Sequence, residues 1–395
     1  MPLFPLIQVI VSRVVIGIIA ILATLGLGSV SEPIATNTTN QTDAPQEVAT
    51  EEPEAPQEAE KDPQKTVETP EEPTAKEGTP TTTPLETVQG LTEEPDEAII
   101  TETATSTHKE PLTFAEINTN TTEALVNILC SQNVATAVTP ITGSGVIIDP
   151  RGVIITNAHV AQFFLLKDYP VEDALSCIIR TGSPARPMYT AELLYIPPIW
   201  ISEHAEDITD SEPTGTGEND YAFLRITGRT SPDAGGLPTS SSYLPMDAEA
   251  TIETGAPVLV AGYPAGFLGG ISVQKDLYSV SSITTIGERF TFNTNTIDLF
   301  STGGTVVSQG GSSGGAVVSA KEKLVGVIVT STNGDTTAER DLRAISVGHI
   351  NRSLFEYSNT TIDALLFGDV ALRARLFNIG TAPALTDILV NSLNN

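Results

Sequence analysis

Three short segments contain the residue types that nucleophilic catalysis by serine requires. His159 follows an apolar run, Asp220 opens another, and Ser313 stands between glycines in the stretch G-S-S-G-G that begins at Gly311. A serine hydroxyl needs an imidazole to take its proton, and a carboxylate must hold that imidazole in one tautomer. The chain supplies histidine, aspartate and serine in that order, each at the edge of a predicted strand. This set indicates serine-type acyl transfer.

Each segment has another interpretation when it is taken alone. A Gly/Ser cluster is usually a linker, and a single histidine or strand-opening aspartate is commonly structural. Ser312 is the alternative nucleophile, and Asp207 and Asp210 are the alternatives to Asp220. The joint occurrence of the three segments favours catalysis over the linker.

Together the segments resemble the chymotrypsin-like serine peptidases, closest to the bacterial HtrA branch, over roughly residues 120–352. The stretch T-N-A-H-V at 156–160 is similar to the family's histidine motif, D-Y-A-F-L-R from Asp220 to its aspartate strand, and G-S-S-G-G to its Gly-x-Ser-Gly-Gly turn. The resemblance implies that His159 is the general base, Asp220 its carboxylate and Ser313 the nucleophile. It also implies an oxyanion hole made by the N–H groups of Gly311 and Ser313. The fold that it implies is all-β, with two antiparallel six-stranded β-barrels, and no cofactor is implied.

The sequence departs from parts of this family in ways that bear on specificity and control. Ser312 replaces the acidic residue that digestive members carry before the nucleophile, so activation by a newly cut N-terminus is not expected. The floor of the primary pocket falls on Val307, which predicts a small or medium apolar side chain in the substrate and no preference for Arg or Lys. Val327, Ile328 and Val329 are expected to line the opposite wall and to pair with the substrate backbone. The chain after Ser346 is too short for a PDZ module.

The pattern of residues divides the chain into four parts. Residues 114–355 carry short β-branched runs between Gly, Pro and Asn, which is typical of an antiparallel barrel or sandwich and forms the expected protease domain. Residues 356–395 have helical apolar spacing, and we expect them to dock on the barrels or to self-associate, with a regulatory effect. Residues 1–30 and 31–113 are of different character.

Residues 1–30 are almost uncharged, and Val14–Val30 is apolar over about the 17 residues needed to cross a bilayer. The segment is either a signal anchor, with Arg13 on the cytoplasmic side, or a cleaved signal peptide. Residues 31–113 are rich in Pro, Thr and Glu, which predicts a disordered linker. The expected location is therefore the cell membrane, with the catalytic part outside the cytoplasm, or secretion if the segment is cleaved.

The charge and the cysteines limit the other classes of function. The formal net charge of −29, most of it in the linker, and the lack of a basic cluster argue against nucleic-acid binding. Cys130 and Cys177 are an even pair in an exported chain, which favours a disulfide over two buried thiols. No His, Cys or Asp grouping has metal-ligand spacing, so no metal is expected.

Two hypotheses of function follow. The first is an exported, membrane-tethered serine endopeptidase that acts on polypeptides, including unfolded ones. The second is a latent or inactive module of the same fold that binds unfolded proteins. The turn from Gly262 to Gly266, Gly-Tyr-Pro-Ala-Gly, is similar to a turn of the HtrA branch, and we expect it to serve backbone geometry. The insertion at 192–217 either shapes the substrate cleft beside Asp220 or is a surface loop.

Overall fold

The computed structural model describes residues 112–394, apart from gaps at 135–140, 211–214, 232, 234, 267, 269, 293–294 and 333. The predicted anchor and linker lie outside these residues. Within the described part of the chain, no helix has both the length and the apolar character that a membrane span requires.

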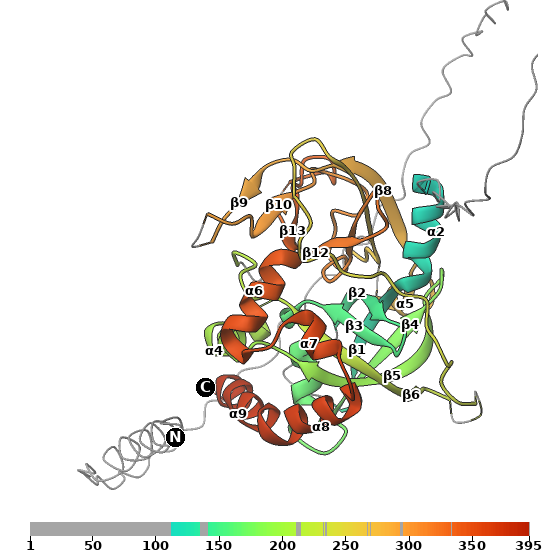
Figure 1. Cartoon of the computed structure of the whole chain (residues 1–395). Helices are drawn as coiled ribbons and strands as arrows, with labels where there is room; N and C mark the ends of the chain where they lie inside the picture. Colours follow the sequence, from blue (N-terminus) through green and yellow to red (C-terminus); the bar gives the residue numbers. More distant parts are fainter. Residues whose placement is uncertain are drawn as a thin grey trace, which may run out of the picture. The chain divides into compact units, whose positions relative to one another are not determined.

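The first half of the described chain forms a closed barrel of six antiparallel strands, which contact in the ring order β1-β2-β3-β6-β5-β4 (Figure 1). Helix α2 (Phe114–Ala124) leads into it, and its first turn is fixed by a capping box between Thr113 and Glu116. β-branched and leucine side chains fill the barrel, among them Val126, Ile154 and Leu224, each 0% exposed. The strands are β1 (Leu125–Gln132), β2 (Ile141–Asp149), β3 (Val153–Thr156), β4 (Leu175–Thr181), β5 (Arg186–Tyr195) and β6 (Ala222–Arg229).

The second half forms a seven-stranded sheet of order β8-β7-β11-β12-β13-β10-β9, where a second six-stranded barrel was expected. Its two edges are joined by a corner instead of a ladder: Ile286 N–H bonds to Ala256 O beside β7, and Gly287 N–H bonds to Ser301 O of β10. A Cβ on Gly287 would lie 2.4 Å from the Ser301 hydroxyl, so the corner requires glycine. The strands are β7 (Pro257–Gly262), β8 (Val280–Thr285), β9 (Arg289–Phe290), β10 (Leu299–Ser301), β11 (Ala316–Ser319), β12 (Leu324–Ser331) and β13 (Leu342–Ser346).

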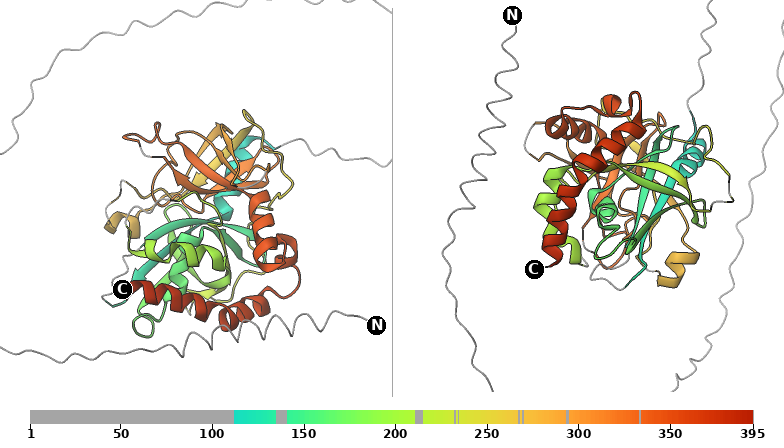
Figure 2. Two further views of the ribbon diagram at one scale, coloured as in Figure 1. Left: turned by 90° about the vertical axis from the view of Figure 1, so that its left-hand side faces the viewer. Right: turned by 90° about the horizontal axis from the view of Figure 1, so that it is seen from below.

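Helices connect the two halves and cover the first barrel. Helix α6 (Val347–Ser358) lies between the sheet and the barrel, and the domain boundary expected at residue 355 falls inside it (Figure 1). The C-terminal helices follow along the outside of the first barrel (Figure 2). Asn378 Nδ2 donates to Leu193 O of β5 at 2.7 Å, and Thr386 Oγ1 donates to Leu165 O at 3.0 Å. These helices are α7 (Ile362–Leu366), α8 (Val370–Gly380) and α9 (Ala382–Leu393).

The remaining helices are short and lie in the connections. Two follow β3 and two occupy the insertion between β5 and β6, where α9 packs on α4 and η2. Much of this insertion is therefore part of the packed surface of the first barrel. The short helices are α3 (Ala158–Ala161), η1 (Gln162–Leu166), α4 (Pro198–His204), η2 (Ala205–Thr209) and α5 (Gly270–Lys275).

The predicted disulfide is confirmed. Cys130 and Cys177 are directly opposite each other on the paired strands β1 and β4, with their Cα atoms 4.0 Å apart and their sulfurs bonded at 2.01 Å. The bond closes a loop with a sequence separation of 47 residues. It thus fixes two neighbouring strands of the barrel that carries His159 and Asp220.

Removing the disulfide should lower stability through the unfolded chain. For a loop of this length, the chain-entropy model gives a loss of about 4 kcal/mol in the free energy of unfolding. We expect the double variant Cys130→Ala, Cys177→Ala to show most of this loss in urea unfolding followed by circular dichroism. An unchanged midpoint and slope, with the oxidised wild type as control, would contradict the assignment of a stabilising role.

Candidate active site

His159 and Asp220 meet because their strands are paired. β3 ends at Thr156 and β6 begins at Ala222, and these two residues are partners in the antiparallel ladder. The histidine two residues into α3 and the aspartate just before β6 are therefore held at the same edge of the barrel. The pairing of these strands explains why residues 61 positions apart form one contact.

The contact between the two side chains is close and doubly made. His159 Nδ1 lies 2.7 Å from Asp220 Oδ2, and the His159 backbone N–H donates to Asp220 Oδ1 at 3.0 Å. Asn157 Nδ2 also donates to Asp220 O at 2.8 Å, which fixes the backbone of the aspartate. When Nδ1–H is donated to the carboxylate, Nε2 is the nitrogen that can accept a proton.

The electrostatic environment favours the charged form of His159. Burial by itself would lower the pKa of the imidazole, but the negative charge of Asp220 and its hydrogen bond outweigh this effect. The pKa of His159 therefore lies above its ordinary value, and the imidazole is a stronger base than an isolated histidine. The His159 side chain remains 28% exposed, so Nε2 is within reach of a bound molecule.

The two alternative aspartates lie elsewhere. Asp207 Oδ2 is 2.8 Å from His204 Nδ1, within the insertion between β5 and β6. Asp210 is exposed at the end of the same insertion. Among the three aspartates considered, Asp220 is the one that contacts His159.

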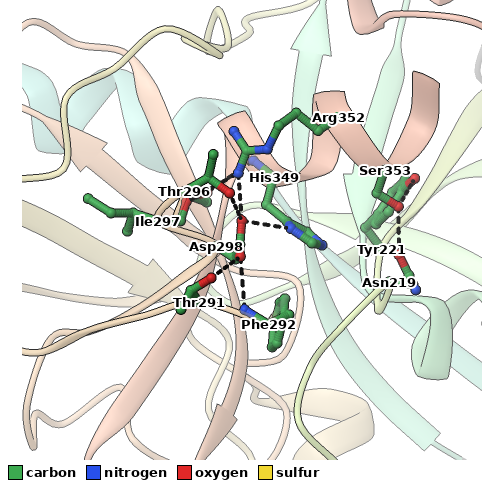
Figure 3. Close-up of polar contacts among 11 residues, drawn as sticks. Asn219, Tyr221, Thr291, Phe292, Thr296, Ile297, Asp298, His349, Arg352 and Ser353 are labelled. Carbon is green, nitrogen blue, oxygen red and sulfur yellow. Dashed lines mark hydrogen bonds and ion pairs between the residues drawn. The ribbon is translucent and has the colours of Figure 1, made fainter. Parts of the chain in front are cut away.

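Helix α6 supports the loop that carries Asp220, which sequence reasoning did not predict (Figure 3). Ser353 Oγ donates to Asn219 Oδ1 at 2.6 Å and is 3.0 Å from the Tyr221 hydroxyl, so one serine contacts the residues on both sides of the aspartate. Asn219 has a φ of +59°, a left-handed conformation that asparagine tolerates better than most residues. Burial raises the pKa of the Tyr221 hydroxyl well above its ordinary value, so it remains a neutral hydrogen-bonding group.

The first turns of α6 are fixed to the second sheet by a buried carboxylate (Figure 3). Asp298 Oδ1 lies 3.1 Å from His349 Nδ1 and accepts a hydrogen bond from Arg352 at 2.6 Å. Burial would raise the pKa of Asp298, but hydrogen bonds from Phe292 N–H, Arg352 and other donors lower it. Burial, only partly offset by Asp298, lowers the pKa of His349. Helix α6 therefore links the second sheet to the Asp220 loop.

The structure distinguishes the two serines of the G-S-S-G-G turn. Ser312 is 1% exposed, and its hydroxyl oxygen has no hydrogen-bond partner among the described residues. Ser313 is partly exposed. Ser313 therefore carries the hydroxyl that a substrate can reach, as the sequence predicts.

Ser313 lies beside the strands that present His159. Ser144 of β2 donates its N–H to Ser313 O at 2.7 Å. A Cβ on the next residue, Gly314, would be 2.0 Å from Ser144 O and 2.5 Å from Thr156 Oγ1, so the turn packs directly against the end of β3. Within the described part of the chain, the Ser313 hydroxyl makes no hydrogen bond to His159 Nε2. Such bonds are often long before substrate binds.

Three successive peptide groups of the turn are fixed through their carbonyl oxygens. Gly310 O accepts from Ala265 N–H at 2.7 Å, Gly311 O from Ser144 Oγ at 2.8 Å, and Ser312 O from Gly315 N–H at 2.9 Å. In a trans peptide the N–H points away from the carbonyl of the same group. The N–H groups of Gly311 and Ser313 are thereby aimed away from these partners, and neither donates to an acceptor among the described residues. Gly311 has a φ of +90°, which favours glycine.

The residues expected to bind substrate are buried. Val307 is 0% exposed and packs in the core of the second sheet, while Val327, Ile328 and Val329 are 0%, 2% and 5% exposed. The neighbouring Val306 is 52% exposed. Ile328 uses its backbone to hold the nucleophile turn, because Gly314 N–H donates to Ile328 O at 2.8 Å. In this structure, the side chains of these four residues belong to the core.

The comparisons with known proteins concern the same part of the chain. Residues 143–327 match the family model described as the trypsin-like peptidase domain. No curated protein matches the sequence. Similar solved structures include the Rv3671c protease from M. tuberculosis in its active form (18% identity, TM-score 0.39, covering 63% of this chain and 87% of that one). Others are the serine endoprotease from Yersinia pestis (21%, 0.39, 64% and 68%) and Deg5 (14%, 0.40, 62% and 94%).

The charge of Asp220 should be visible in the titration of His159. We expect the pKa of His159, measured by NMR of the ring resonances, to lie above the ordinary value of about 6.5. In Asp220→Asn, burial remains while the charge is lost, so the pKa should fall below that value. His204 provides an internal control, because its partner Asp207 is unchanged. Equal pKa values of His159 in both proteins would contradict the account.

Proposed function

We propose that this chain, a serine-type peptidase that carries the trypsin-like domain, hydrolyses internal peptide bonds of polypeptides through His159, Asp220 and Ser313. The observation that carries the proposal is the arrangement around the turn at 311–315. Asp220 occupies Nδ1 of His159, Ser313 is accessible beside it, and two backbone N–H groups have no internal acceptor among the described residues. Each is a part that acyl transfer requires.

The geometry assigns each residue a step. His159 Nε2 takes the proton of the Ser313 hydroxyl while Oγ forms a bond to the carbonyl carbon of the substrate. The negative charge that develops on the carbonyl oxygen is met by the N–H groups of Gly311 and Ser313. The imidazolium, stabilised by Asp220, then gives its proton to the leaving amine as the C–N bond breaks. Water, deprotonated by His159, releases the acid and restores the serine.

The pH dependence of the reaction follows from the pKa of His159. The general base must be neutral to accept the Ser313 proton, so activity requires a pH above the pKa of His159. Since Asp220 raises that pKa, the acidic limb of the rate profile should lie above the ordinary histidine range. The buried Val307 supplies no charge at the expected pocket floor, which supports a small or medium apolar side chain before the scissile bond.

The test is hydrolysis of fluorescently labelled casein by the full chain and by two serine variants. We expect Ser313→Ala to lose activity by on the order of a millionfold, because the nucleophile and its partners act as a unit. Ser312→Ala is the discriminating variant: it should keep most of the activity if Ser313 is the nucleophile and lose it if Ser312 is. Casein that binds to the wild type and is not cut would favour the binding module over the peptidase.

We also propose that the peptidase is held at the cell membrane by residues 1–30, with residues 31–113 as a spacer and the catalytic part outside the cytoplasm. The apolar Val14–Val30 segment and Arg13 on its N-terminal flank support this arrangement. The disulfide between Cys130 and Cys177 also supports it, because such bonds persist in oxidising compartments.

Fractionation of cells tests the tether. The full chain should sediment with membranes, resist extraction by high salt and be digested by protease added outside the cytoplasm. A chain beginning at residue 31 and fused to a cleavable signal peptide should be soluble in the same compartment. Recovery of the full chain as a soluble cytoplasmic protein would contradict the proposal.

A further inference from the structure

Ser144 is the residue at which the first barrel, the second sheet and the nucleophile turn come together. It is 0% exposed on β2. Its N–H donates to Ser313 O at 2.7 Å, its hydroxyl donates to Gly311 O at 2.8 Å, and the same hydroxyl accepts from Tyr263 N–H at 2.9 Å. Its carbonyl accepts from Thr156 Oγ1 at 2.7 Å. Every polar group of this serine is therefore engaged, and two of its bonds go to the turn.

The bond from the hydroxyl controls the orientation of a flexible part of the turn. Gly310 and Gly311 lack a Cβ, so the peptide between them has more rotational freedom than other peptides. Ser144 Oγ fixes the following carbonyl, that of Gly311, while Ala265 N–H fixes the preceding one, that of Gly310. Together these two bonds determine where the Gly311 N–H points.

The Gly262–Gly266 turn is part of the same support. Tyr263 N–H reaches the Ser144 hydroxyl, and Ala265 N–H reaches Gly310 O. A Cβ on Gly311 would lie 2.7 Å from Tyr263 O, so the two turns are in direct contact. Ser144 joins this turn of the second half to the β2 strand of the first.

We propose that Ser144 is a positioning residue whose hydroxyl holds the oxyanion hole in its formed state. The inference rests on the proposed peptidase function and adds its preorganisation. Without the hydroxyl, Gly311 O and Tyr263 N–H both lose a buried partner, and the Gly310–Gly311 peptide can turn. That rotation would replace the Gly311 donor by a carbonyl oxygen. The loss falls on the charged transition state and not on the bound substrate.

Ser144→Ala in the full chain tests the inference, measured with the best peptide p-nitroanilide found by cleavage profiling. We expect kcat to fall at least about 10-fold, towards the hundred- to thousandfold effect of losing one oxyanion donor, while KM changes by less than about threefold. The affinity for a peptide boronate, whose adduct with serine is tetrahedral and anionic, should fall in parallel with kcat/KM. Ser144→Thr, which keeps the hydroxyl, should restore both values.

The matched control is Thr302→Val. Thr302 is also buried, and its hydroxyl also donates to a backbone carbonyl, Leu342 O at 3.2 Å, but it does not contact the turn. This variant should lose thermal stability without a selective loss of kcat or boronate affinity. If Ser144→Ala does not fold, Ser144→Cys, which retains the volume but only a weak donor, is measured in the same way.

The outcomes separate the two proposals. A folded Ser144→Ala protein with the kcat and boronate affinity of the wild type, or with losses equal to those of Thr302→Val, overturns the positioning role and leaves the peptidase intact. A wild type that neither turns over peptides nor forms a boronate adduct at Ser313 refutes the proposed function, and the inference with it.

Discussion

The hydrogen-bonded contact between Asp220 and His159 is the interaction on which the site depends. It exists because β3 and β6 pair antiparallel, so that the end of one strand and the start of the other lie at the same edge of the barrel. A shift of one residue in that pairing would turn the side chains to opposite faces. The filled barrel core and the Cys130–Cys177 bond oppose such a shift. The stability of the first barrel and the basicity of His159 therefore have the same origin.

The nucleophile comes from the other half of the molecule, which makes the contact between the halves part of the site. Ser144 connects them at the turn, where it bonds to Gly311 and Ser313. Helix α6 connects them again on the other side, because Asp298 holds its first turns and Ser353 reaches the Asp220 loop. The halves are thus joined at both the serine and the aspartate. A change in either connection would be felt by the reacting groups before the fold is lost.

The sequence predicted the residues whose types the chemistry demands: His159, Asp220 and Ser313 stand in motifs that few other functions need. It also predicted the disulfide and the short antiparallel strands. It could not predict Ser144 or Ser353 as supports, because a buried serine has no distinguishing sequence pattern and its partners are far away in the chain. The corner that closes the seven-stranded sheet was missed for the same reason, since it depends on where two separate loops meet. Val307 was assigned to a pocket by position, and its burial is a property of packing that position does not give.

The most direct measurement of the central claim is the site of covalent modification by a fluorophosphonate, mapped by mass spectrometry of the digested protein. The reagent requires an activated serine hydroxyl and an available oxyanion hole. The account predicts rapid, stoichiometric labelling of Ser313 in the folded chain, greatly slowed in His159→Ala and absent after unfolding. A folded wild type in which Ser313 stays unmodified while exposed serines react just as slowly would contradict it.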